Sequence, residues 1–186
     1  PMRLFVALEL SDAVRAAVRE LIGRLQRARS DLRWVRPEGM HLTLKFIGEV
    51  PEDKLEPIRA ALGGVTSPQP VTLEFRELGY FPNERRPRVL WVGIEASDNL
   101  APLAAQIEAA LEPLGVERED RDYVPHLTLG RFKGSQRVEE LQEEIAALPS
   151  TEFGRIETGE FFLFQSKLSP AGAQYTKLHG FPFVRS

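Results

Sequence analysis

The sequence contains no cysteine, and this absence removes several kinds of chemistry. Disulfide bonds, zinc–thiolate sites, thiol nucleophiles and iron–sulfur clusters all require that residue. Long hydrophobic runs are missing as well. Because nothing approaches about 18 consecutive apolar residues, the sequence predicts no transmembrane helix. The apolar run at residues 4–8 is too short for the core of a signal peptide, so we expect a cytoplasmic protein.

A basic excess is also lacking, because the net charge is −3. Proteins that coat long nucleic acids usually carry a strong positive charge. The composition therefore argues against that class and leaves a short oligonucleotide or an RNA terminus as a candidate partner. The chain has 186 residues, of which 42% are hydrophobic. This is enough for one globular body of ordinary size.

An internal repeat is the strongest organisational signal in the chain. Residues 4–12 read LFVALELSD and residues 90–98 read LWVGIEASD, with five identities at an offset of 86. Apolar residues at helical spacing follow each segment, and a Ser-Asp pair suited to helix capping precedes them. Adding 86 to the apolar positions of the first helix predicts that the second helix buries the set Leu100, Leu103, Ala104, Ile107 and Leu111.

The repeat predicts the architecture. Each copy reads as strand, helix, strand, helix, strand, with the copies starting near residues 3 and 89. We expect a single domain over residues 1–186 made of two similar lobes related by a pseudo-two-fold axis. Hairpin-like connections favour an α+β fold, with antiparallel sheets lining a central cleft and helices outside. Lobe junctions are a preferred location for clefts.

The same tetrapeptide, His-Leu-Thr-Leu, occurs in each copy, at residues 41–44 and 126–129. On a strand, alternate side chains share a face. His41 and Thr43 are therefore expected on one face and the leucines on the core face, and the same holds for His126 and Thr128. A lone His-x-Thr is a weak signal, but a copy at the equivalent place in each repeat is hard to assign to chance.

Two imidazoles and two hydroxyl groups suit the cleavage of a phosphodiester. Near neutral pH one ring can be neutral and take a proton from the nucleophile, while the other is charged and protonates the leaving oxygen. The hydroxyl groups of Thr43 and Thr128 can donate hydrogen bonds to the non-bridging oxygens. The sequence also leaves threonine open as a nucleophile, although the second motif would then have no matching role.

Other catalytic classes find less support. No Asp or Glu lies within two residues of His41 or His126, so a metal site is not predicted, and neither is any cofactor. The chain has no Gly-x-Ser-x-Gly elbow of a serine hydrolase and no phosphate-binding loop ending in Gly-Lys. Strict alternation places Phe46 in the core first, although its ring could instead stack on a base.

Together these residues resemble the 2H phosphoesterases, and within them the RNA 2′,3′-cyclic phosphodiesterases historically called 2′-5′ RNA ligases. The likeness covers nearly the whole chain and includes both motifs. It is carried by the segments 3–8, 41–49, 78–82, 87–93, 126–132 and 178–182, together with Trp34.

The resemblance implies metal-independent hydrolysis of a terminal 2′,3′-cyclic phosphate to a 2′-phosphomonoester. His41 would protonate the leaving 3′ oxygen, His126 would activate water, and Thr43 and Thr128 would bind the phosphoryl oxygens. Arg131 is similar to the phosphate-contacting arginine of the family. Strict alternation puts Arg131 on the opposite face from His126, unless a bulge near Gly130 reverses it.

Two alternatives remain at the level of sequence. One is the reverse reaction, which joins RNA ends through a 2′-5′ linkage. The other is a non-catalytic protein that binds RNA ends, although binding alone does not need an acid and a base. The expected partner is RNA with a 2′,3′-cyclic end or a small cyclic nucleotide, with no membrane, and we expect a monomer.

Overall fold

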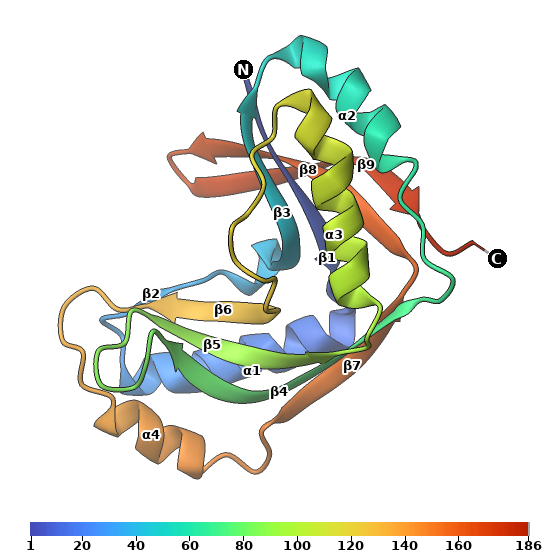
Figure 1. Cartoon of the computed structure of the whole chain (residues 1–186). Helices are drawn as coiled ribbons and strands as arrows, with labels where there is room; N and C mark the ends of the chain where they lie inside the picture. Colours follow the sequence, from blue (N-terminus) through green and yellow to red (C-terminus); the bar gives the residue numbers. More distant parts are fainter. Residues whose placement is uncertain (186) are drawn as a thin grey trace.

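The computed structural model describes residues 1–185, which fold into one four-stranded and one five-stranded antiparallel sheet with helices on their outer faces (Figure 1). The strands are β1 (Met2–Glu9), β2 (Arg33–Trp34), β3 (His41–Val50), β4 (Val71–Phe81), β5 (Val89–Ala96), β6 (His126–Arg131), β7 (Glu152–Thr158), β8 (Glu160–Ser169) and β9 (Gly172–Pro182). The helices are α1 (Asp12–Ala28), α2 (Leu55–Leu62), α3 (Leu100–Leu111) and α4 (Glu139–Ala146). Short 3-10 turns cover Pro37–Gly39, Glu52–Lys54 and Glu112–Leu114.

The strand order gives the pseudo-two-fold relation. One sheet has the order β3-β1-β8-β9 and the other β2-β6-β5-β4-β7. The pair β3-β1 thus corresponds to the pair β6-β5, and β8-β9 corresponds to β4-β7. The predicted α+β fold with antiparallel sheets is confirmed.

Each sheet draws strands from both sequence repeats. Strand β4 belongs to the first repeat but pairs with β5 and β7, and β8 belongs to the second repeat but pairs with β1. The first helices are exchanged in the same way, because α1 packs on β7 and α4 while α3 packs on α2 and β3. Figure 1 shows α1 behind strands β5 and β4 of the second sheet, and α3 beside β3 and β1 of the first. A lobe in space is therefore not a repeat in sequence.

Helical periodicity accounts for both long helices. In α1 the Ser11 side chain accepts a hydrogen bond from the Val14 backbone nitrogen at 3.2 Å, which caps the first turn. In α3 the buried residues are the five predicted from the repeat: Leu100, Leu103, Ala104, Ile107 and Leu111. One continuous apolar core joins both helices to the outer faces of both sheets.

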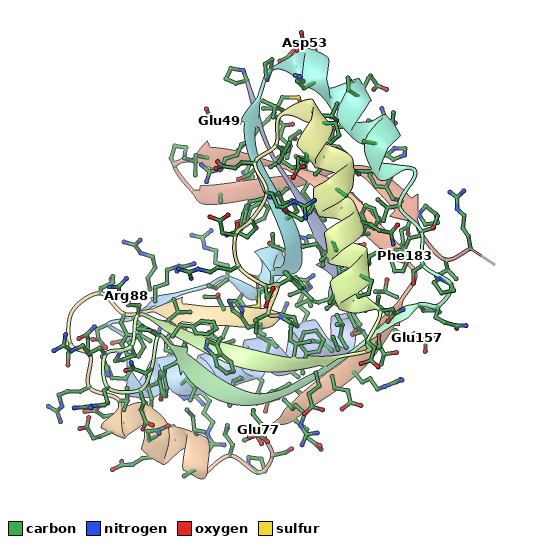
Figure 2. The ribbon with its side chains drawn as sticks, viewed as in Figure 1. Glu49, Asp53, Glu77, Arg88, Glu157 and Phe183 are labelled. Atoms are coloured by element: carbon green, nitrogen blue, oxygen red, sulfur yellow. The ribbon has the colours of Figure 1, made fainter. Side chains whose placement is uncertain are left out.

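The outer surface is polar around this core. Figure 2 shows Glu49, Asp53, Glu77 and Glu157 at the periphery of the molecule, and all four are exposed. Phe183, by contrast, is fully buried. No helix among residues 1–185 is long and apolar enough to cross a membrane.

Candidate active site between the two sheets

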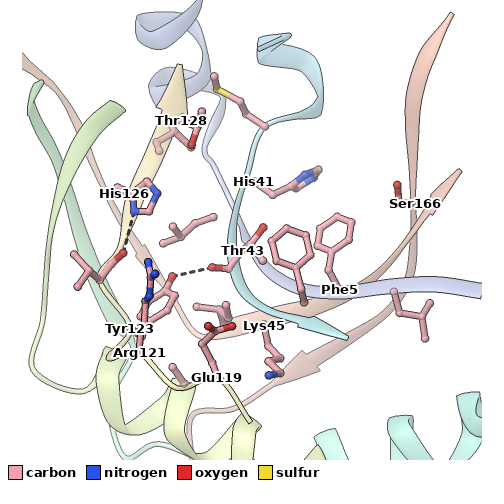
Figure 3. A pocket seen from close by; sticks show the side chains of 18 of the residues that line it. Phe5, His41, Thr43, Lys45, Glu119, Arg121, Tyr123, His126, Thr128 and Ser166 are labelled. Carbon is pink, nitrogen blue, oxygen red and sulfur yellow. Dashed lines mark hydrogen bonds between the residues drawn. The ribbon is translucent and has the colours of Figure 1, made fainter. Parts of the chain in front are cut away.

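A cleft of about 980 Å³ lies between the two sheets, and both His-x-Thr motifs line it. Figure 3 shows His41 and His126 on strands at opposite sides of this cleft, with Thr43 and Thr128 beside them. Phe46 and Arg131 line it too, so all six predicted site residues come together. This volume is at the upper end of the range for small-molecule sites, so the cleft is large enough for a nucleotide.

A β-bulge in β3 explains the position of Phe46. Thr43 pairs with Ala7 and Lys45 pairs with Val6, so that Leu44 is an extra residue in the strand. The extra residue reverses the alternation, because two residues of β3 then oppose one of β1. Phe46 therefore shares the cleft face with His41 and is 69% exposed. The expectation that Phe46 belongs first to the core was wrong for this reason.

The same reversal buries Lys45, which strict alternation would place on the face of His41. Its side chain is 6% exposed. The Nζ atom pairs with Glu108 Oε1 at 2.6 Å and donates a hydrogen bond to the Glu117 carbonyl at 2.7 Å. Lys45 thus ties β3 to α3 and to the segment that follows α3.

A second bulge occupies the equivalent place in β6. Thr128 pairs with Trp91 and Gly130 with Leu90, which leaves Leu129 as the extra residue. Arg131 is thereby turned onto the face of His126 and Thr128. The bulge that the sequence suggested near Gly130 is confirmed, and its extra residue is Leu129, one position earlier. Both motifs consequently present the residue five positions after the histidine to the cleft: Phe46 in one, Arg131 in the other.

Aromatic rings surround His41. Its ring centroid lies 4.3 Å from that of Phe164, 6.1 Å from Phe5 and 5.7 Å from Tyr175, the last edge-on. Burial against these rings lowers the pKa of His41, since the charged form loses its hydration. The positive charge of Arg15 lowers this pKa further, whereas a backbone hydrogen bond at Gly39 acts in the opposite direction.

His126 is held by one backbone contact and one ring. Its Nδ1 atom lies 3.0 Å from the Val124 carbonyl oxygen, and its ring meets Phe81 edge-on at 4.8 Å. A carbonyl can only accept, so Nδ1 must carry the hydrogen in this contact. The neutral ring then has its free lone pair on Nε2, the tautomer that a general base toward the cleft requires.

The segment 115–125, between α3 and β6, closes one side of the cleft, and we call it the strap. Figure 3 shows its residues Glu119, Arg121 and Tyr123 below the two histidines. The Tyr123 hydroxyl donates a hydrogen bond to the Thr43 carbonyl at 2.9 Å, which connects the strap to the first motif. Burial raises the pKa of this hydroxyl, so it stays protonated as a donor.

The sequence interpretation missed the aromatic wall of the first lobe. Strand alternation in β1 contains the signal, because Leu4, Val6 and Leu8 are buried on the core face and Phe5 and Ala7 point the other way. Phe164 stacks on Phe5 with centroids 5.2 Å apart, and nothing local in the sequence identifies that pairing.

The third histidine, His179, lies outside the site. His179 Nδ1 is 2.9 Å from Arg59 Nη2, which joins β9 to α2. Within residues 1–185, no group of three His, Asp or Glu side chains is arranged to hold a metal ion.

Two facing sheets, each carrying one His-x-Thr strand toward a shared cleft, define a phosphoesterase of the paired-histidine class. A model of the family described as LigT like Phosphoesterase matches this sequence twice in succession, at residues 8–91 and 92–175. The protein belongs to the LigT-like phosphoesterase family.

Similar proteins cover nearly the full chain. An RNA 2′,3′-cyclic phosphodiesterase of Archaeoglobus fulgidus is 39% identical over 180 residues, spanning 97% of this chain and 99% of its own. A crystal structure from Thermus thermophilus has a TM-score of 0.78 at 34% identity, covering 97% of each chain. The structure of E. coli LigT complexed with 3′-AMP has a TM-score of 0.78 at 26% identity, covering 100% of this chain and 99% of the other.

Proposed function

We propose that the protein hydrolyses a 2′,3′-cyclic phosphate, at an RNA end or on a nucleoside, to a 2′-phosphomonoester, with His41 and His126 as the acid–base pair. One observation carries the proposal: the two motifs meet in one cleft, on corresponding strands of two different sheets. The A. fulgidus relative, an RNA 2′,3′-cyclic phosphodiesterase, supports the same reaction.

The mechanism follows from the two histidines. His126 accepts a proton from water through Nε2, while its Nδ1–H stays bonded to the Val124 carbonyl. The water oxygen forms a bond to phosphorus as the bond from phosphorus to the 3′ oxygen breaks. His41 gives its proton to that 3′ oxygen. Proton transfers of this kind each contribute roughly 10²–10⁴-fold to a rate.

Four other residues hold the substrate in this proposal. The hydroxyl groups of Thr43 and Thr128 donate to the non-bridging oxygens, where negative charge develops. Arg131 contributes a cation on the same face as His126, and the exposed ring of Phe46 offers a stacking surface for a base.

The acid role of His41 depends on the substrate. In the free protein, burial lowers the pKa of His41 and so favours its neutral ring. A phosphodiester bound beside the ring carries a negative charge, and an opposite charge within a few ångströms favours the protonated form. Substrate binding therefore favours the protonated form of His41, which is the form that a general acid requires.

The first experiment is hydrolysis of adenosine 2′,3′-cyclic phosphate with and without EDTA, followed by NMR of the product. We expect 2′-AMP in equal amounts under both conditions. The variants His41→Ala and His126→Ala should each lose about 10²–10⁴-fold in kcat. As a matched control, His179→Ala removes a histidine outside the cleft, whose ring contacts Arg59 of α2 and Phe181 of β9, and its kcat should be unchanged.

Two outcomes would contradict the proposal. Full activity in either motif variant would exclude paired-histidine catalysis. A protein that binds the cyclic nucleotide and an RNA oligomer with a cyclic end, yet turns over neither, would instead be a binder of RNA ends.

We further propose that the protein acts as a monomer and in the cytoplasm. One chain supplies both motifs, so the cleft is complete without a second copy. The absence of cysteine suits a reducing compartment. Light scattering of the purified protein tests the first point, and a dimer mass would contradict it.

A further inference from the structure

Two arginines lie directly opposite each other at the end of the second sheet. Arg33 of β2 pairs with Arg131 of β6 in the antiparallel register, so both side chains leave the same face of the sheet. That face carries His126 and Thr128, and both arginines are exposed. Like charges directly across a strand pair destabilise a sheet.

Neither arginine has a compensating carboxylate. Among residues 1–185, no Asp or Glu oxygen lies within 4.0 Å of a nitrogen of Arg33 or Arg131. The acidic residue nearest in sequence, Asp31, is held by Arg29 through two bonds of 2.7 and 3.0 Å. The pair is therefore open to an external anion.

The distance from the histidines indicates which anion. On the straight partner β5, His126 is opposite Gly93 and Arg131 is opposite Val89, four residues away. Four strand steps correspond to about 13 Å. A long arginine side chain at Arg131 can reach back toward the reacting phosphate. Arg33, on the outer strand β2, is placed for a group farther along the cleft.

The backbone that follows Arg33 leads directly into the cleft. Val35, two residues after Arg33, lines the cleft, and its backbone nitrogen donates to the Leu129 carbonyl at 2.8 Å. Arg33 therefore lies just beyond Val35, at the border of the cleft, on the strand position opposite Arg131. A planar guanidinium matches the geometry of a phosphate group and can bind it through two hydrogen bonds.

Resting on the proposed function, we propose that Arg33 binds the phosphodiester on the 5′ side of the terminal nucleotide, while Arg131 beside it serves the reacting phosphate. A nucleoside 2′,3′-cyclic phosphate has no such group, whereas an RNA end always has one. Arg33 is then a specificity residue that makes the protein prefer an RNA terminus to a mononucleotide.

The experiment compares two substrates that differ by this phosphate: adenosine 2′,3′-cyclic phosphate and the dinucleotide ApA with a 2′,3′-cyclic end. The quantity is the ratio of kcat/KM for the dinucleotide to kcat/KM for the mononucleotide. In Arg33→Gln we expect this ratio to fall by roughly tenfold to hundredfold, the size of a lost hydrogen bond to a charged group. Arg33→Lys keeps the charge but lacks the two parallel N–H donors of the guanidinium, so its ratio should fall less than that of Arg33→Gln.

Arg27→Gln is the matched control. Arg27 is exposed near the end of α1, which packs on the face of the sheet away from the cleft. Arg27→Gln removes one positive charge, as Arg33→Gln does, and should leave the ratio of the two kcat/KM values unchanged. Salt gives a second readout, because Arg33→Gln should reduce the slope of log kcat/KM against log salt by about 1 for the dinucleotide.

The proposal is overturned if Arg33→Gln leaves the ratio unchanged or if Arg27→Gln lowers it equally. Binding separates this result from a failure of the proposed function. If the wild-type protein hydrolyses neither substrate, calorimetry measures the dissociation constants of 2′-AMP and of ApA 2′-phosphate. Their ratio then replaces the ratio of the two kcat/KM values. Equal dissociation-constant ratios in wild type and Arg33→Gln would then overturn the role of Arg33.

Discussion

At the scale of single residues, two chemically identical histidines occupy different surroundings. His41 is buried among aromatic rings of the first sheet, and this burial is the largest cause of its lowered pKa. His126 is oriented by the Val124 carbonyl, which selects one tautomer. The repeat supplies two equal imidazoles, and their neighbours make them unequal.

Charged neighbours of His41 make a prediction about pH dependence. The positive charge of Arg15 lowers the pKa of His41 and the negative charge of Glu9 raises it. Arg15→Gln should therefore raise this pKa, and Glu9→Gln should lower it. If His41 is the acid, kcat/KM falls as His41 loses its proton, so the alkaline limb moves to higher pH in Arg15→Gln and to lower pH in Glu9→Gln.

The measurement is the profile of kcat/KM for adenosine 2′,3′-cyclic phosphate from about pH 5 to pH 8.5. If the acid limb moves instead, His41 is the base, so the moving limb assigns the roles. The limbs report the coupled pair, and a histidine NMR titration of the free protein provides the control. Limbs that stay in place in both variants would exclude His41 from either role.

Much of the site follows from sequence, because it depends on local pattern. His41, Thr43, His126 and Thr128 are identified by a motif that occurs once in each repeat. Phe46 shows where local pattern is insufficient. Its face is decided by Leu44, an extra residue defined only by the register between β3 and β1. That register is a long-range property, which no spacing within β3 reveals.

At the scale of elements, the strap depends on buried contacts with β3. Lys45 binds the Glu117 carbonyl, and Glu108 Oε2 accepts a hydrogen bond from the Glu119 backbone nitrogen at 2.8 Å. Lys45 and Glu108 are themselves paired at 2.6 Å. The bulge in β3 therefore turns a lysine into the anchor of a segment that is distant in sequence.

Lys45→Met tests this anchor. Removing one partner of a buried ion pair leaves the other charge without compensation, which destabilises by roughly 3 kcal/mol. We expect a loss of this size in the free energy of unfolding, measured with urea. The double variant Lys45→Met with Glu108→Leu should regain much of the lost stability, because neither charge then remains buried without its partner.

The exposed pair of Arg59 and Glu56, at 2.8 Å on α2, serves as a control. Breaking it with Glu56→Gln should change stability by less than about 1 kcal/mol. An effect of Lys45→Met as small as this would show that the strap does not depend on Lys45.

At the scale of the whole molecule, the two repeats fold through each other. The first repeat contributes β2, β4 and α1 to the second lobe, and the second repeat contributes β8, β9 and α3 to the first lobe. The sequence predicts two similar lobes from the duplication, and it contains no local sign of this exchange. Which sheet a strand joins depends on pairing between residues far apart in the chain, as in Phe5 with Phe164.

Cutting the chain between the repeats tests the exchange. The turn between β4 and β5 is exposed over residues 82–86, so a cut there removes few contacts of its own. Fragments 1–85 and 86–186 should each lack a cooperative thermal transition by circular dichroism, because neither holds all the strands of a sheet. Mixed in equal amounts, they should regain the transition and the hydrolysis of adenosine 2′,3′-cyclic phosphate. A fragment that folds alone would contradict this interdependence.

The bulge that follows each motif has one more consequence. Two identical His-Leu-Thr-Leu strands facing each other would accept a cyclic phosphate in two orientations related by a half-turn, with either ribose oxygen leaving. Five residues after the histidine, one strand carries the ring of Phe46 and the other the guanidinium of Arg131. A half-turn would exchange a stacking surface for a cation. We therefore expect a nucleotide, with a base on one side and phosphates on the other, to bind in one orientation and yield a single isomer from a nearly symmetric scaffold.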